Sequence, residues 1–218
     1  MYHTILFDLD GTLTDSKKGI FKSIQYALRR MDAPVPDEIV LTKFIGPPLQ
    51  DSFIRYCGFT EEQTRRAITL FRERYAPKGQ FESVAAPGMP ELCGELKAQG
   101  RTVALSSSKP EKMCVSICRR LGYAPSMSAI VGSPESGDWS KADVIRETLR
   151  RLKLTDADKA EILMVGDRKF DVEGAAACGI DCVGVEFFGY AAPNELRDAG
   201  AITVVKTAEA LRAFLLSR

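Results

Sequence analysis

A short apolar run near the start of this chain ends in two acidic residues, and that junction constrains the fold more than any other feature. Residues 5–7 (Ile-Leu-Phe) are followed by Asp-Leu-Asp-Gly-Thr at 8–12. The apolar run predicts a buried strand, and the polar segment predicts a turn after it. Because alternate side chains of a strand share one face, we expect Asp8 and Asp10 side by side at its carboxyl end. Two close carboxylates repel one another, so we expect a cation between them, and Mg²⁺ prefers oxygen ligands.

The length and composition of the chain allow one large domain or one domain with an insertion. Its 218 residues are 45% hydrophobic and 27% charged, as is typical of a globular protein. No apolar run approaches the roughly 20 residues that cross a bilayer, and no secretion signal precedes the first strand. We therefore expect a cytoplasmic protein without a membrane partner. The formal net charge is +1 without a long like-charge block, which gives no support for a nucleic-acid partner.

The six cysteines and the single histidine disfavour several kinds of site. The cysteines include no Cys-x-x-Cys pair and mostly lie in apolar surroundings, so we expect reduced thiols that pack in the core. His3 is the only histidine and precedes the first strand. Mechanisms that need a histidine base or several histidine metal ligands are therefore disfavoured.

The pattern of apolar residues divides the chain into a helical part and an alternating part. Residues 16–80 carry helical patterns and no convincing strand, with the clearest apolar stripe at 19–31 and a capped helix start at Thr60. After Pro87, strands and helices alternate. The expected strands are 102–107, 129–131, 162–165, 182–185 and 202–205, and the expected helices are 91–99, 111–121, 141–152, 172–178 and 208–216.

This alternation predicts an α/β fold: a Rossmann-like three-layer core, in which helices cover both faces of a mainly parallel sheet. The first strand belongs to that sheet, so the helical part interrupts it. We expect a core formed by residues 1–15 and 81–218 and an inserted all-helical cap domain at 16–80.

Polar groups lie at three further positions where such a sheet binds ligands, outside the carboxyl ends of its strands. Ser107 and Ser108 offer hydroxyl and amide groups for an oxyanion, and a serine cap on the next helix is the simpler interpretation. Lys141 opens a helix, where a cation is unfavourable against the helix dipole, so we expect a functional reason for a lysine at this position. The alternative interpretation is an ordinary solvated lysine. Asp167 and Asp171 follow the strand at 162–165 and can also cap the next helix.

Taken in order, these groups resemble the four motifs of the haloacid dehalogenase superfamily of phosphohydrolases. The segment 8–12 looks like the opening motif, although alone it also fits an ordinary strand and Asp-Gly turn. Residues 10–16 are similar to the phosphoglycolate phosphatase-like branch, and Ser107 stands where that family more often has threonine. The resemblance implies that Asp8 is the nucleophile and that Asp10 protonates the leaving oxygen and then activates water.

The resemblance also implies the phosphate and metal ligands. Ser107, the backbone amide of Ser108 and Lys141 are expected to bind the phosphoryl oxygens. Mg²⁺ is expected to be held by three groups, with a fourth in support. These are Asp8, Asp167 and the main-chain carbonyl of Asp10, supported by Asp171. Arg168 stands where many relatives have Thr or Ser, a departure that leaves the ligands intact.

The inserted cap is expected to select the substrate. Between residues 15 and 80 it carries twelve basic and eight acidic residues, a balance of 12 − 8 = +4 that would steer an anionic substrate, and a solvated helix surface explains it equally well. Lys43 and Gly46, in a loop stiffened by Pro47 and Pro48, are the candidate substrate-binding residues of the cap. Similar Gly-Pro-Pro loops occur in phosphoglycolate phosphatases and in some 5′-nucleotidases.

These observations favour an Mg²⁺-dependent phosphatase that hydrolyses a small phosphomonoester, phosphoglycolate phosphatase-like, through an aspartyl-phosphate intermediate. A 5′-nucleotidase acting on nucleoside monophosphates fits the same residues, and a phosphosugar mutase uses the same core. A receiver-like phosphoacceptor domain also groups aspartates, a hydroxyl and a lysine, but its phosphoacceptor normally lies on an interior strand of a shorter chain without a cap. The intact set of acids leaves little room for an inactive binding protein. We expect a small phosphorylated metabolite as the partner and a monomer or homodimer.

Overall fold

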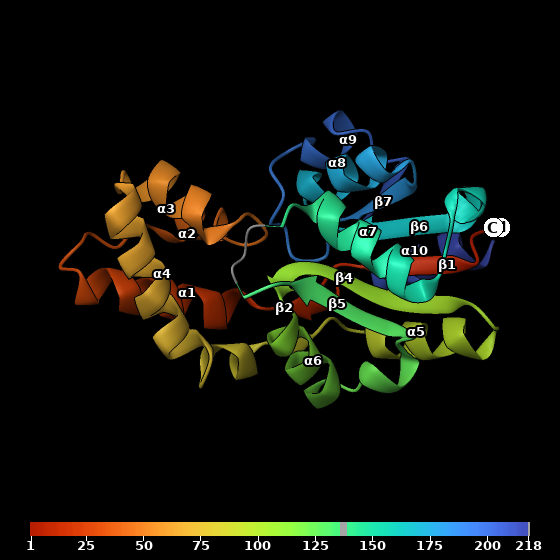
Figure 1. The fold of residues 1–218 in the computed structure, drawn as a ribbon, viewed down its shortest axis with the longest axis horizontal. Helices are drawn as coiled ribbons and strands as arrows, with labels where there is room; N and C mark the ends of the chain where they lie inside the picture. The colour runs from red at the N-terminus through yellow and green to blue at the C-terminus, as the bar shows by residue number, and fades with distance from the viewer. Residues whose placement is uncertain (136–138, 218) are drawn as a thin grey trace. The chain divides into compact units, whose positions relative to one another are not determined.

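The computed structural model describes residues 1–135 and 139–217, and it divides the chain into two compact units. One unit combines Met1–Thr14 with Ala85–Arg218, and the other consists of Asp15–Val84. We call them the core unit and the inserted unit (Figure 1). No helix in the described ranges is long and apolar enough to cross a membrane.

The core unit is built on a six-stranded sheet in the order β5-β4-β1-β6-β7-β8. Its strands are β1 (Thr4–Phe7), β4 (Thr102–Pro110), β5 (Ala129–Ser133), β6 (Ile162–Gly166), β7 (Asp181–Val185) and β8 (Thr203–Val205). Every neighbouring pair is parallel. β1 therefore lies between two strands that come much later in the chain, and its last residue, Phe7, pairs with Leu105 on one side and Val165 on the other.

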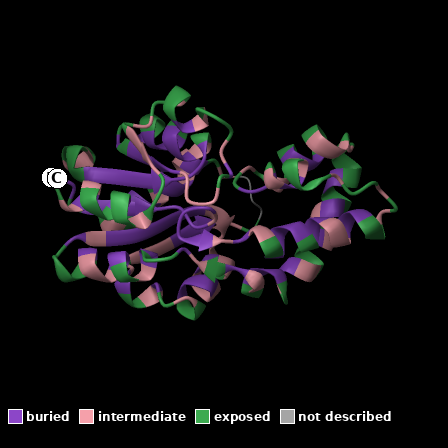
Figure 2. Cartoon of the chain, turned by 180° about the vertical axis from the view of Figure 1, so that it is seen from behind, coloured by how far each residue is buried: buried purple, intermediate pink, exposed green. Residues whose placement is uncertain are grey.

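Helices cover both faces of this sheet, which confirms the predicted Rossmann-like α/β class. Ile5 and Phe7 of β1 face one apolar cluster, whereas Leu6 faces the other, as the alternation of a strand requires. Figure 2 shows the strands as the most continuously buried part of the core unit. The first cluster includes residues of α5 (Met89–Ala98), α6 (Glu111–Arg120) and α10 (Ala208–Leu216), and the second includes residues of α7 (Lys141–Leu152), α8 (Lys169–Cys178) and α9 (Glu195–Asp198).

Two short 3₁₀ helices, η2 (Ala124–Ser126) and η3 (Asp156–Glu161), complete the described elements of the core unit. The six cysteines are free thiols, as predicted, and five of them are buried. Burial raises the pKa of Cys93 to about 12, which keeps this thiol protonated and unreactive at neutral pH.

The inserted unit is helical and contains α1 (Lys17–Arg30), α2 (Glu38–Thr42), α3 (Leu49–Cys57), α4 (Glu61–Tyr75) and η1 (Gly79–Glu82). α4 begins at the capped start expected at Thr60, whose hydroxyl accepts a hydrogen bond from the N–H of Gln63. Short strands β2 (Thr14–Asp15) and β3 (Val84–Ala85) pair where the chain enters and leaves this unit.

The inserted unit ends at Val84, four residues beyond the predicted boundary at 80, and it starts at Asp15. The contacts of Glu82 account for the later end. Its carboxylate binds Lys22 of α1 at 3.1 Å and Arg74 of α4 at 2.9 Å, and these bonds tie η1 to the two long helices of the unit.

Candidate active site

Asp8 lies immediately after β1, beside the end of β6, whereas β4 on the other side continues to Pro110. Its backbone N–H donates to the carbonyl of Val165 at 2.9 Å, so the strand pairing continues up to the carboxylate itself. Asp8 is buried, and its Oδ1 lies 2.5 Å from the Nζ of Lys141. The same ammonium lies 2.6 Å from Oδ1 of Asp171. Lys141 thus bridges two carboxylates that follow different strands.

The position of Lys141 explains why a cation opens α7 despite the helix dipole. Only 8% of the residue is exposed, which excludes the solvated-lysine interpretation. Its backbone follows the N-cap Ser140, whose hydroxyl accepts from the N–H of Asp143. Its stem packs on Gly174 of α8, where an added Cβ would lie 2.8 Å from Cγ of Lys141. A residue without a side chain at 174 therefore lets the lysine reach the acids.

Asp167, after β6, completes a compact acidic cluster with Asp8 and Asp171. All three residues are buried, and one carboxylate oxygen from each lies within 4.8 Å of the others. Oδ1 of Asp167 accepts a hydrogen bond of 3.4 Å from Thr12. Gly11 has a φ of 91°, and a Cβ there would lie 2.0 Å from Oδ2 of Asp167. The turn after β1 must therefore contain glycine to leave room for this carboxylate.

The electrostatics of the cluster fit a hard divalent cation. Burial raises the pKa of Asp8 to about 6, although the Lys141 ammonium opposes that rise. Burial and the charges of Asp171 and Asp8 hold the pKa of Asp167 well above its ordinary value. Oδ2 of Asp167 is buried and has no hydrogen-bond partner in the described part of the chain. A buried carboxylate oxygen without a partner, beside two other carboxylates, is a donor set suited to Mg²⁺.

Lys141 itself stays charged in this setting. Burial would lower the pKa of its ammonium, but the neighbouring carboxylates of Asp171 and Asp8 outweigh burial and raise that pKa above its ordinary value. The site therefore keeps a fixed positive charge next to the acid cluster.

The carboxylate of Asp10 is not one of the three clustered carboxylates, and it pairs with a residue that had no role in the sequence-based prediction. Its Oδ2 lies 2.7 Å from the Nζ of Lys109, near the end of β4. Lys109 directly follows the Ser-Ser-Ser segment at 106–108. Its position next to this motif is the one feature of the sequence that could have indicated a role for it. The predicted metal ligand from Asp10 is its main-chain carbonyl, and the ion pair with Lys109 involves only its side chain.

Ser107 and Ser108 belong to β4, which runs to Pro110 instead of ending at 107. The interpretation of these serines as a helix cap is wrong, because α6 begins after Pro110 and has no side-chain cap. Ser107 is buried, and its hydroxyl oxygen accepts a hydrogen bond of 3.4 Å from the N–H of Lys109. The carbonyl of Ser108 accepts a hydrogen bond of 2.8 Å from Ser133 of β5.

The two candidate cap residues lie in the inserted unit. Lys43 follows α2, and its ammonium lies 5.7 Å from the ring centroid of Tyr56. Gly46 has a φ of 102°, a conformation that favours glycine. Their roles in substrate binding stay predictions.

Arg168, the departure from the family pattern, is buried and bound to an acid of α9. Its Nε lies 2.8 Å from Oε1 of Glu195, which also accepts a hydrogen bond from the backbone N–H of Lys169 at 3.0 Å. The bound guanidinium therefore braces the turn that carries Asp167.

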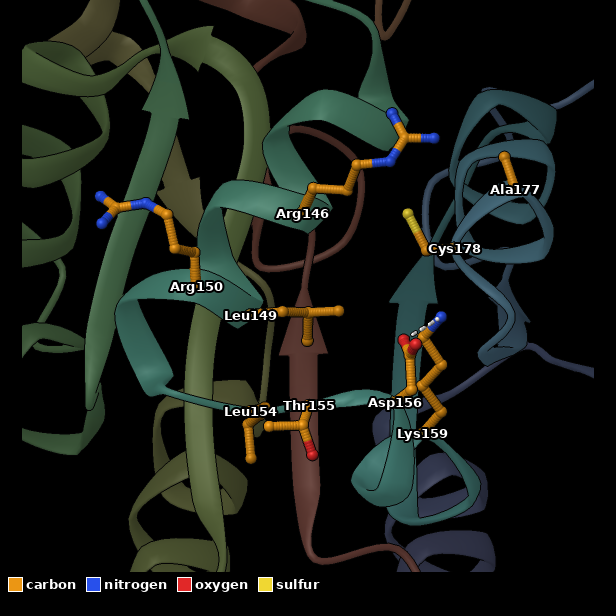
Figure 3. Close-up of a pocket in the computed structure, with 9 residues that line it drawn as sticks. All are labelled: Arg146, Leu149, Arg150, Leu154, Thr155, Asp156, Lys159, Ala177 and Cys178. Carbon is orange, nitrogen blue, oxygen red and sulfur yellow. Dashed lines mark ion pairs between the residues drawn. The ribbon is translucent and has the colours of Figure 1, made fainter.

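A hollow of about 390 Å³ on the core unit lies between the C-terminal half of α7, the end of α8 and η3 (Figure 3). Its charged side chains already have partners: Arg146 pairs with Asp143 and Lys159 with Asp156. Leu149, in its lining, is eight residues beyond Lys141, about 12 Å along the helix. This hollow contains none of the clustered acids.

Comparison with known proteins identifies the family. Residues 5–185 match the family model described as haloacid dehalogenase-like hydrolase. The chain belongs to the haloacid dehalogenase-like hydrolases. A structure described as a predicted phosphatase from Clostridium acetobutylicum is 38% identical, with a TM-score of 0.93 and full coverage of both chains. Within this family, the chain is a phosphatase.

Three of the relatives show that proteins similar to this chain carry different names. A 5′-nucleotidase of Pseudomonas aeruginosa is 39% identical over 90% of this chain and 87% of its own length. The tyrosine-protein kinase PtkA of Mycobacterium tuberculosis is 36% identical over 92% of this chain and 67% of its own length. A phosphoglycolate phosphatase of Mesorhizobium japonicum is 27% identical over 98% of this chain and 95% of its own length.

Proposed function

We propose that this phosphatase is Mg²⁺-dependent and hydrolyses a small phosphomonoester through an aspartyl-phosphate on Asp8. The observation that carries the proposal is the Lys141 ammonium, which bridges Asp8 and Asp171 beside the carboxylate of Asp167. A buried carboxylate held by a cation and placed next to a metal donor set suits attack on phosphorus.

The chain's own residues supply the attacking oxygen and the proton transfers. Lys141 holds Oδ1 of Asp8, so the carboxylate keeps one orientation, and one of its oxygens attacks the phosphorus. The bond between phosphorus and the leaving oxygen breaks, and Asp10 gives that oxygen a proton. Asp10 then takes a proton from the water that attacks the aspartyl-phosphate, which releases phosphate and restores Asp8.

The phosphoryl group needs several donors in the transition state. Lys141, Ser107 and the backbone amide of Ser108 are the proposed ones. Asp8, Asp167 and the main-chain carbonyl of Asp10 would hold Mg²⁺, with Asp171 in support, and the bound ion would neutralise charge on the phosphoryl oxygens.

The substrate class that we put first is the nucleoside 5′-monophosphates. The 5′-nucleotidase of P. aeruginosa supports it, since it is 39% identical over most of both chains. Phosphoglycolate is the second class, supported by the phosphoglycolate phosphatase-like motif at residues 10–16 and by the relative of that name. We place Lys43 and Gly46 of the inserted unit at the substrate, and we expect a monomer or homodimer that has no nucleic-acid partner.

The experiment is phosphate release from a panel of nucleoside monophosphates, phosphoglycolate, sugar phosphates and pyrophosphate, with Mg²⁺ and with EDTA. ATP with a tyrosine peptide tests the phosphotransfer suggested by the kinase relative. We expect metal-dependent release concentrated on one class. Absence of release from every compound, by folded protein in Mg²⁺, would refute the proposal.

Asp8→Asn should abolish turnover and leave the circular dichroism spectrum unchanged. Asp156→Asn is the matched control, because the side chain of Asp156 is 94% exposed and lies outside the acidic cluster. Undiminished hydrolysis by Asp8→Asn would remove Asp8 from the role of nucleophile.

A further inference from the structure

Lys109 contacts the residue that transfers protons in the proposed reaction. Its ammonium lies 2.7 Å from Oδ2 of Asp10, and the two side chains are only 8% and 13% exposed. An ion pair that is largely shielded from water is screened far less than a surface pair and holds its partner in a more fixed geometry. The orientation of the Asp10 carboxylate therefore depends on this lysine.

The backbone around Lys109 is itself held on both sides. Its N–H donates to Ser107 at 3.4 Å, and its carbonyl accepts from the thiol of Cys114 at 3.4 Å. Pro110, the next residue, pairs with Ser133 of β5. The stem of Lys109 thus starts from a short irregular stretch that is held between two residues paired with β5, Ser107 and Pro110, as a group that positions another group requires.

The two oxygens of Asp10 differ in their surroundings. Oδ2 is bound by Lys109, whereas Oδ1 is buried and has no hydrogen-bond partner in the described part of the molecule. A buried carboxyl oxygen without a partner is costly to maintain, so its retention points to a group that arrives during function. Oδ1 is therefore the oxygen of Asp10 that the ion pair with Lys109 leaves uncommitted.

We propose that Lys109 is a positioning residue of this phosphatase: it binds Oδ2 of Asp10 so that Oδ1 carries the proton to and from the reacting oxygens. The inference rests on the proposed function. As the phosphorus–oxygen bond of the ester breaks and the bond to Asp8 forms, the proton on Oδ1 passes to the leaving oxygen. In the second step Oδ1 takes a proton from water, whose oxygen bonds to phosphorus while the bond to Asp8 breaks.

The test compares two leaving groups. An alkoxide leaves poorly without a proton, whereas the p-nitrophenolate anion leaves readily without one, so only the alkyl ester depends on a well-placed acid. We would measure kcat and KM for p-nitrophenyl phosphate and for the alkyl phosphomonoester that the wild-type protein hydrolyses fastest in the panel above. The variants are Lys109→Met, Lys109→Gln, Lys109→Arg and Asp10→Asn.

We expect Lys109→Met and Lys109→Gln to lower kcat for the alkyl ester by about tenfold or more, with kcat for p-nitrophenyl phosphate changed less than about threefold. KM should change little for either ester. Asp10→Asn should show the same selectivity with a larger loss, and Lys109→Arg should restore most of the alkyl activity. Lys112→Met is the matched control, since that side chain is 84% exposed, and it should match the wild type.

An equal loss on both esters would overturn the inference, because it would assign Lys109 to the phosphoryl group or to the fold. An unchanged kcat for the alkyl ester would overturn it as well. Failure of the proposed function gives a different result, in which the wild-type protein itself releases no phosphate.

Discussion

Raising the pH from 5 to 7 should destabilise the metal-free chain. Burial raises the pKa of Asp8 from 3.8 to about 6, and burial also raises the pKa of Asp167 well above its ordinary value. A carboxyl whose pKa is higher in the folded chain binds more protons when folded, so the free energy of unfolding falls as the pH rises through that interval. For Asp8 alone, the two pKa values lower the free energy of unfolding by about 1 kcal/mol between pH 5 and 7. Asp167 adds to this loss.

Acids in ion pairs with arginine contribute to the pH dependence of stability at lower pH, so they do not obscure this effect. Hydrogen bonds from Arg150 and Arg151 hold the pKa of Glu147 at about 2. A carboxyl whose pKa is lower in the folded chain contributes stability above its unfolded pKa, and that contribution is lost only as the pH falls through its folded pKa. The interval from pH 5 to 7 therefore reports mainly on the buried cluster.

Urea denaturation in EDTA at pH 5, 6 and 7 measures the effect, with the fluorescence of Trp139, the only tryptophan, as the signal. With an m-value of about 2 kcal/mol/M, the midpoint should be about 0.5 M lower at pH 7 than at pH 5. Asp8→Asn should reduce this difference. A midpoint that stays constant or rises between pH 5 and 7 would refute the reasoning.

Mg²⁺ should reverse this dependence, because it competes with protons for the same carboxylates. Saturating Mg²⁺ should raise the midpoint at pH 7 by more than at pH 5. An equal increase of the urea midpoint at pH 5 and at pH 7 would mean that the ion binds away from these carboxylates.

Three further substitutions test single contacts. Gly11→Ala should abolish Mg²⁺ binding in calorimetry, because its Cβ would lie 2.0 Å from Oδ2 of Asp167; binding of normal affinity would show that the turn can shift. Thr12→Val should weaken Mg²⁺ binding by about tenfold, since it removes the hydrogen bond to Asp167 and keeps the volume. Tyr123→Phe should lower the free energy of unfolding by about 1 kcal/mol, since it removes the buried 2.6 Å hydrogen bond to the carbonyl of Leu13; an unchanged thermal midpoint would contradict this.

Apolar periodicity was enough to predict most of the core unit. α7 and α10 have the bounds that the sequence indicated, because their apolar faces are regular and their caps are clear. The loop expected at residues 43–48 is present, but the sequence did not delimit α3, which begins directly after it at Leu49 with Pro48 as its N-cap. Proline is tolerated at a helix start because the first backbone N–H groups have no partner within the helix, so the end of this loop is also compatible with the start of a helix.

The sequence indicated which side chains meet, because strand ends of a parallel sheet converge. Asp8, Lys141, Asp167 and Asp171 lie together for that reason. The pair between Lys109 and Asp10 depends on the reach and rotamer of a long side chain, which no spacing rule supplies. Nor does a spacing rule show that β4 continues through the serines to Pro110, since its register shifts between Ser107 and Pro110.

The central place of β1 also affects the order of events during synthesis. Asp8 precedes Lys141 by 133 residues, so at about 5–20 residues per second the ribosome delivers the lysine roughly 7–27 s after the aspartate. During that time β1 lacks β6, its partner on one side, while the helices α1–α4 already have their own contacts. A nascent chain, or one cut short before α7, thus carries the carboxylate of Asp8 without its cation, and under the proposed mechanism we expect it to hydrolyse no phosphate ester.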